Sequence, residues 1–150
     1  MSLVKQIDSN LIEALKAGEK AKVTVLRGLK SDLKYKLIAK GEELTDDDII
    51  AVLSSAAKRR RESIEQFRQG NRNDLADKEQ SELEIIQQYL PKQMDEEKVR
   101  QIVAEAIEET GADSPQKIGL VMKAVMPRLK GKADGKLVNR LVAELLNKQE

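Results

Sequence analysis

One stretch near the C-terminus decides the fold: IGLVMKAVMPRLKGKADGKLVNRLVAELL, residues 118–146. Apolar residues recur there every three or four positions on either side of a central turn, which is the spacing of one helix face. Gly131 suits the left-handed residue that ends a helix, and Asp134 suits the N-cap of the next helix. The two predicted stripes are Ile118, Met122, Val125 and Leu129, followed by Leu137, Leu141 and Leu145. The stretch therefore predicts a hairpin of two helices.

Positive charge is concentrated at the turn of this hairpin. Five basic residues stand against one acidic residue, Asp134, which gives a local net charge of +4: Arg128, Lys130, Lys132, Lys136 and Arg140. Such cations bind phosphate groups and require little else from the site. We expect all five residues to contact RNA if the protein binds RNA at all.

The composition predicts an all-α protein. Charged residues make up 35% and aromatic residues 2% of the 150 residues, so the core must be aliphatic. Strands are usually rich in aromatic and β-branched residues, so the scarcity of aromatic residues favours helices. Apolar periodicity predicts seven helices in two small domains. These are an N-terminal four-helix part, residues 1–91, and a C-terminal three-helix bundle, residues 94–150, separated by a short polar segment.

The stripes of the first two helices also predict core residues. The first helix, about residues 3–17, should bury Val4, Ile7, Leu11 and Leu15. The second, about residues 19–41, should bury Val23, Leu26, Leu29, Leu33 and Leu37. The third helix should begin at Thr45, whose side chain can cap it, with three aspartates in the favourable first turn.

A second basic segment covers residues 16–40, with eight basic residues against two acidic ones and a net charge of +6. One interpretation is a solvated outer face, in which lysine stems cover the edges of the core. The other is a surface that binds a polyanion. In the second case Lys30 and Lys34, together with Arg59 from the next basic cluster, should contact RNA.

Polar residues interrupt the apolar stripes of the third and fourth helices. If these helices fold back at Asn71, Arg61 lies opposite Glu82. We therefore expect a structural ion pair in which Arg60 or Arg61 bonds Glu79 or Glu82. This pairing accounts for the carboxylates without a catalytic role.

Several classes of function are disfavoured by the residues that are absent. There is no histidine and no cysteine, the commonest metal ligands and general bases, so we expect no metal, no cofactor and no catalytic residue. Capping explains the three consecutive aspartates after Thr45. No window is apolar enough for a membrane span, and the N-terminus does not resemble a signal peptide. We expect a cytoplasmic protein with no membrane partner.

Three blocks carry a resemblance to a known family. They are VLRGLKSDLK at residues 25–34, RRRESIEQFRQGNRNDLADKEQSELEIIQQYLP at residues 59–91, and the opening stretch at residues 118–146. Over essentially its full length the chain resembles the YqeY-like proteins. Residues 94–150 also resemble the tail domain of the B subunit of the tRNA-dependent amidotransferase, GatB. In that enzyme the tail is a mobile helical module that contacts tRNA.

The resemblance implies a non-catalytic helical module that contacts tRNA or other RNA, accessory to tRNA-dependent amidation or to translation. The alternative is a protein-binding adaptor, whose partner would be an aminoacyl-tRNA synthetase or an amidotransferase component. Its apolar patch would be sought at Met94, Met122 and Met126. Carbon–nitrogen ligase activity is a third and weaker interpretation, because no part of the chain resembles the amidotransferase catalytic domain, and fold analogy does not transfer function.

Overall fold

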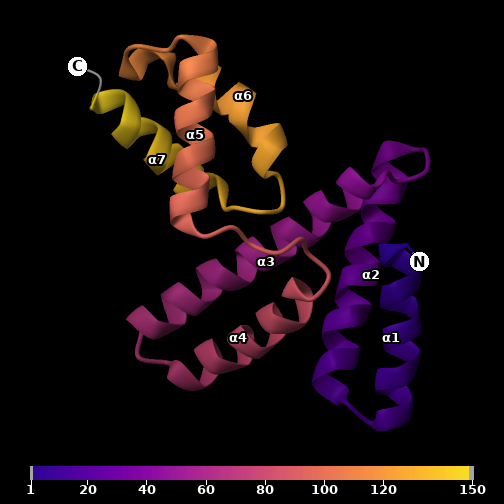
Figure 1. Cartoon of the computed structure of the whole chain (residues 1–150). Helices are drawn as coiled ribbons and strands as arrows, with labels where there is room; N and C mark the ends of the chain where they lie inside the picture. The colour runs from indigo at the N-terminus through magenta and orange to yellow at the C-terminus, as the bar shows by residue number, and fades with distance from the viewer. Residues whose placement is uncertain (1, 149–150) are drawn as a thin grey trace. The chain divides into compact units, whose positions relative to one another are not determined.

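The computed structural model describes residues 2–148 and contains no strand in that range (Figure 1). Its seven α-helices are α1 (Leu3–Ala17), α2 (Lys20–Lys40), α3 (Asp46–Gln69), α4 (Asn73–Gln87), α5 (Glu96–Thr110), α6 (Ile118–Leu129) and α7 (Gly135–Asn147). A short 3-10 turn, η1 (Pro115–Lys117), leads into α6. The predicted all-α class is confirmed.

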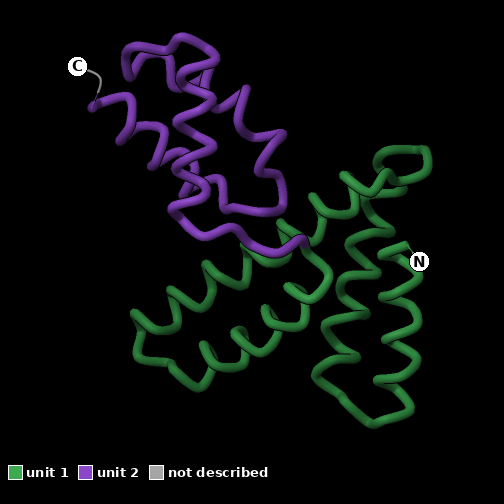
Figure 2. Tube along the Cα trace, in the orientation of Figure 1, with its two compact units in different colours: residues 1–90 green, residues 91–150 purple. Residues whose placement is uncertain are grey.

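The chain divides into two compact units (Figure 2). Unit 1 comprises residues 1–90 with α1–α4, and unit 2 comprises residues 91–150 with α5–α7. The polar segment after Pro91 has a defined structure within unit 2. The Gln93 side-chain amide donates to the Gly131 carbonyl at 2.7 Å, and the Met94 N–H donates to the Lys132 carbonyl at 2.9 Å. These bonds attach the segment to the α6–α7 turn.

Unit 1 consists of two helical hairpins. Helices α1 and α2 run side by side in opposite directions, as do α3 and α4 (Figure 1). Gly18, which ends α1 with a φ of 72°, reverses the chain in the first hairpin. Asn71 has a φ of 57° in the second, a conformation that asparagine tolerates better than most residues. Both reversals therefore occur at residues suited to left-handed backbone.

The core of unit 1 is aliphatic, with one aromatic member, Tyr89. Its largest fully buried side chains are Ile7, Leu26, Leu29, Leu53 and Ile86. Burying a side chain of this kind contributes roughly 1.5–3 kcal/mol. Every helix of unit 1 contributes buried side chains to this core, so all four helices belong to one packed unit.

The core of unit 2 is built the same way from α5, α6 and α7. It includes Val99, Val103, Val121, Val125, Leu129, Val138 and Leu141. Pro127 lies in the last turn of α6, and the helix ends two residues later at Leu129, as expected for a residue that lacks a donor. Gly131, with a φ of 76°, and the Asp134 cap then turn the chain into α7.

Three residues predicted to be buried are exposed: Val4 (36%), Leu15 (49%) and Leu37 (44%). Among the helices, α1 contacts α2 and α3, and the ends of its apolar stripe extend beyond the residues that cover it. Leu37 lies beyond Leu33, the last buried residue of α2. The prediction was wrong at these positions because periodicity identifies a face and does not show how much of it a neighbour covers.

The start of α3 is fixed by a capping box. The Thr45 hydroxyl accepts a hydrogen bond from the Asp48 N–H at 3.1 Å, and the Asp48 carboxylate accepts from the Thr45 N–H at 2.9 Å. Lys40, at the end of α2, also bonds the Asp48 carboxylate. First this lysine and then the Thr45 N–H hold the pKa of Asp48 below its ordinary value of 3.8.

We predict that Thr45→Ala lowers the free energy of unfolding by about 1 kcal/mol, because α3 loses its side-chain cap. Urea unfolding monitored by circular dichroism measures this. Thr24→Ala is the matched control, since the exposed Thr24 hydroxyl bonds only the Lys20 carbonyl within α2. Equal losses in the two variants would contradict the capping role.

We also predict a pH dependence from Asp48. Its pKa is lowered on folding, so its contribution is complete above the unfolded value of 3.8 and declines as the pH falls below that value. Asp48→Asn should therefore be less stable than the natural protein at neutral pH, with a smaller difference near about pH 3. Urea unfolding at both pH values tests this, and a constant difference would rule it out.

Candidate nucleic-acid interface

Helix α2 carries the largest net charge of the helices in the described chain. Seven basic residues of this helix stand against one acidic residue: Lys20, Lys22, Arg27, Lys30, Lys34, Lys36 and Lys40 against Asp32. Each residue advances a helix by roughly 100°. Arg27 and Lys34, seven residues apart, therefore share a stripe on the side opposite the buried Leu29. The fold directs this stripe to solvent.

Ion pairs divide the basic residues of α2 into two groups. The Lys30 ammonium lies 2.9 Å from an Asp8 carboxylate oxygen of α1, and Lys40 bonds Asp48 of α3. Arg27, Lys34 and Lys36 form no ion pair with any residue of the described range. Of the α2 residues predicted to contact RNA, Lys34 is available and Lys30 is already engaged.

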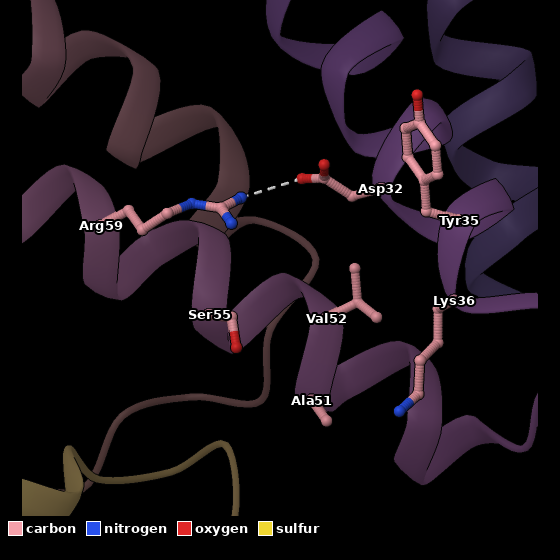
Figure 3. Close-up of a pocket in the computed structure, with 7 residues that line it drawn as sticks. All are labelled: Asp32, Tyr35, Lys36, Ala51, Val52, Ser55 and Arg59. Atoms are coloured by element: carbon pink, nitrogen blue, oxygen red, sulfur yellow. Dashed lines mark hydrogen bonds and ion pairs between the residues drawn. The ribbon is translucent and has the colours of Figure 1, made fainter. Parts of the chain in front are cut away.

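Arg59 of α3, the third residue predicted in this region, is also paired. Its guanidinium donates to the Asp32 carboxylate of α2 at 3.0 Å (Figure 3). The side chain remains 61% exposed. Arg59 thus lies next to α2 and stays accessible to a ligand, although one of its donors is used.

The basic turn between α6 and α7 is less positive than its local sequence indicates. Arg128 lies 3.2 Å from Glu105 and 3.5 Å from Glu109, and Arg140 is paired with Glu96. These three carboxylates of α5 offset three of the four net positive charges counted in residues 128–140. Arg128 and Arg140, both predicted to contact RNA, are therefore engaged with carboxylates of α5.

The remaining predicted residues of this turn lie at its tip. Lys130 is exposed, and Lys132 is half-buried, with its carbonyl bonded to Met94. The Lys136 N–H donates to the capping Asp134 carboxylate at 3.2 Å. That carboxylate already satisfies the start of α7, where a phosphate would otherwise bind.

An Arg–Glu pair joins α3 and α4 inside unit 1. The Arg60 Nε lies 3.5 Å from a Glu82 carboxylate oxygen, and the Arg60 guanidinium also donates to the Ala56 carbonyl at 3.3 Å. Burial, followed by the negative charge of Glu82, raises the pKa of the neighbouring Glu79.

The fold-back register predicted Arg61 opposite Glu82, whereas the structure places Arg60 there. A shift of one residue rotates a helix face by roughly 100°, so only one of two adjacent arginines can point at α4.

The aromatic residues differ widely in exposure. Tyr35 on α2 is 72% exposed and Phe67 is half-buried. Tyr89 is buried, and its hydroxyl accepts a hydrogen bond from the Asn10 amide at 2.7 Å. Next to Tyr35, Ile38 is 67% exposed. Sequence reasoning missed Tyr35 and Ile38 as surface residues, although both project away from the Leu29 side of the helix.

The comparisons with known proteins assign the chain to a family. A family model described as Yqey-like protein matches residues 4–146, nearly the whole chain. The chain belongs to the YqeY-like family. The predicted resemblance to this family is thereby confirmed.

Three curated relatives of this YqeY-like protein come from fungi. An uncharacterised protein of Schizosaccharomyces pombe is 34% identical over 57% of the chain and 69% of its own length. The "Altered inheritance of mitochondria protein 41, mitochondrial" of Lachancea thermotolerans is 38% identical over 58% of the chain, and the match spans 47% of that protein. The protein of the same name from Pyrenophora tritici-repentis is 25% identical over 96% of the chain and 81% of its own length.

These names contradict the predicted cytoplasmic location, because the relatives that carry them are called mitochondrial. The prediction rested on the lack of an apolar membrane span and of a signal-peptide pattern, and neither of these names a compartment. Among residues 2–148, no helix has both the length and the apolar composition to cross a bilayer.

We predict that Arg60 and Glu82 are energetically coupled. Their side chains are only 21% and 17% exposed, so removing one partner leaves a poorly solvated charge. Arg60→Ala and Glu82→Ala should each cost about 2 kcal/mol, and the double variant should cost clearly less than the sum. Urea unfolding of the four proteins gives the coupling energy.

The matched control is a second pair across the same two helices, Arg68 and Asp77, 3.8 Å apart with 49% and 74% of the side chains exposed. Solvent-exposed pairs of this kind contribute roughly 0–1 kcal/mol. Additive losses at Arg60 and Glu82, no different from those at Arg68 and Asp77, would exclude a structural ion pair.

Proposed function

We propose that this YqeY-like protein is a non-catalytic module that contacts RNA through the basic surface of α2. The observation that carries the proposal is the solvent-facing pair Arg27 and Lys34, which forms no ion pair in the described range. Unpaired cations at fixed spacing attract a phosphate backbone, and no internal ion pair has to be broken when the phosphates bind. If this face served only solubility, acidic residues would be as suitable as basic ones, yet α2 contains almost no acidic residues.

An exposed aromatic residue supports the same surface. Proteins that contact unpaired RNA commonly stack bases on aromatic side chains. Tyr35 lies on α2 between Lys34 and Lys36 in sequence and is 72% exposed. The surface therefore combines groups for the phosphate and for the base.

The α6–α7 turn is a secondary contact in this proposal. Lys130 and Lys132 lie at its tip, whereas Arg128 and Arg140 would have to leave carboxylates of α5 to reach a phosphate. The sequence resemblance noted for residues 94–150 to the amidotransferase tail domain supports tRNA as the RNA. It also supports a role accessory to tRNA-dependent amidation or to translation.

The non-catalytic part of the proposal rests on chemistry. The chain has no histidine and no cysteine. In the part of the chain that the structure describes, Glu79 is the one carboxyl whose pKa is raised, and it lies beside a structural ion pair, which accounts for its environment. Within residues 2–148, no cluster of three or more carboxylates could hold a metal ion.

A protein-binding adaptor is the second candidate, and one observation favours it. Leu37 and Ile38 are 44% and 67% exposed next to Tyr35 on α2. The methionines first considered for such a surface, Met94, Met122 and Met126, instead pack against the core of unit 2. An adaptor surface would therefore lie on the C-terminal half of α2.

We predict saturable binding of fluorescently labelled tRNA that weakens as salt is raised. The Arg27→Ala, Lys34→Ala double variant should bind more weakly, and the slope of log affinity against log salt should fall by roughly 0.7–0.9 for each lost contact. Fluorescence anisotropy titrations at two salt concentrations measure both quantities. The Lys130→Ala, Lys132→Ala double variant should show a smaller loss.

The matched control is the Lys5→Ala, Lys78→Ala double variant, which removes two exposed lysines of α1 and α4. It lowers the net charge by the same two positive charges. It should bind tRNA like the natural protein. If the control variant lost as much tRNA affinity as the Arg27→Ala, Lys34→Ala variant, the loss would be explained by net charge alone. If the natural protein shows no binding at low micromolar concentration, the RNA proposal fails and the adaptor takes its place.

A further inference from the structure

An open pocket of about 400 Å³ lies between α2 and α3 within unit 1 (Figure 3). Helix α2 contributes Asp32, Tyr35 and Lys36, and helix α3 contributes Ala51, Val52, Ser55 and Arg59. The volume falls within the range of roughly 300–1,000 Å³ typical of small-ligand sites. The pocket also contains Lys36, a further basic residue of α2 that forms no ion pair within the described residues.

The lining of this pocket is chemically divided. Ala51 and Val52 supply apolar contacts, and Val52 projects between Arg59 and Tyr35 (Figure 3). Tyr35 supplies an aromatic ring, and Ser55 supplies a hydroxyl that can donate or accept a hydrogen bond. Lys36 and Arg59 supply positive charge on opposite helices. A simple inorganic anion would use the cations and leave the ring and the apolar wall unused.

The Asp32–Arg59 ion pair positions the Arg59 guanidinium and uses only part of its hydrogen-bonding capacity. One terminal nitrogen of the guanidinium donates to Asp32 at 3.0 Å. A guanidinium has five N–H donors in a rigid fork, so donors remain for a second acceptor. Arg59 can therefore bind a phosphate while Asp32 fixes its position, and no ion pair has to break.

We propose that this pocket binds one unpaired nucleotide of the RNA, with its base against Tyr35 and Val52 and its phosphate on Arg59. The inference rests on the proposed function and narrows the RNA to one with an unpaired end or loop. A duplex keeps its bases stacked inside and presents only phosphates, which would leave Tyr35 without a role. The outer cations Arg27 and Lys34 would hold the flanking backbone.

The first test uses a fluorescent reporter in the pocket. The chain contains no tryptophan, so Tyr35→Trp introduces a single indole that can be excited outside the absorption band of RNA. A short single-stranded RNA should quench this fluorescence saturably, because the base stacks on the indole. A blunt duplex of the same sequence should bind through phosphate contacts with little quenching.

The second test uses affinity. Tyr35→Ala should weaken binding of the single strand about tenfold, in line with the loss of one stacked base. Tyr35→Phe should recover most of that loss, since the phenyl ring still stacks. Ile38→Ala is the matched control on the same helix and should leave affinity unchanged, because Ile38 is exposed but does not line the pocket. Urea unfolding of each variant checks that the fold is intact.

The outcomes separate this inference from the proposed function. If Arg27→Ala, Lys34→Ala weakens binding but Tyr35→Ala does not, RNA binds α2 and the pocket assignment is overturned. Equal quenching by single strand and duplex, or equal losses in Tyr35→Ala and Ile38→Ala, overturns it as well. If neither the natural protein nor the Tyr35→Trp variant binds any RNA, the proposed function itself fails.

Discussion

Both units depend on the packing of narrow aliphatic stripes from short helices. Aromatic residues make up only 2% of the chain, so each core consists of leucine, isoleucine, valine and alanine in close contact, with Tyr89 as an aromatic member in unit 1. Among the described residues, no polar or charged residue is fully buried. The many charged residues therefore remain on or near the surface, where they pair with residues of neighbouring helices. The distribution of positive potential is a consequence of that pairing.

The two basic regions differ because their neighbours differ. In unit 2, α5 places three carboxylates against Arg128 and Arg140, which leaves a turn with little net charge. In unit 1, Asp8 and Asp48 engage Lys30 and Lys40, and Arg27 and Lys34 of the outer stripe form no ion pair within the described residues. The helix with the unpaired cations also carries the exposed tyrosine. This coincidence makes α2, rather than the α6–α7 turn, the centre of the proposed function.

The polar contacts inside unit 1 have structural explanations that limit what they can do chemically. Arg60 and Glu82 join α3 to α4, and Glu79 has its pKa raised mainly because it is partly buried beside them. Asp48 connects the end of α2 to the start of α3 through Lys40 and the capping box. Asp32 likewise positions Arg59 between the same two helices. The pocket walls are thus fixed relative to each other at both ends.

The sequence by itself determined the helices, their caps and most of the core, because these follow from interactions over a few residues. The Thr45 box, the Gly131 turn and the Asp134 cap are examples. The Yqey-like family could likewise be recognised from sequence blocks.

Only the tertiary structure decided which cations remain available and which arginine meets Glu82. The partners of Arg128 and Arg140 lie 23 and 44 residues away in sequence, so no local count could find them. The choice of Arg60 over Arg61 depends on the rotation of α3 against α4, which packing sets. The pocket was also beyond prediction, because its walls come from two helices whose crossing the sequence pattern does not specify.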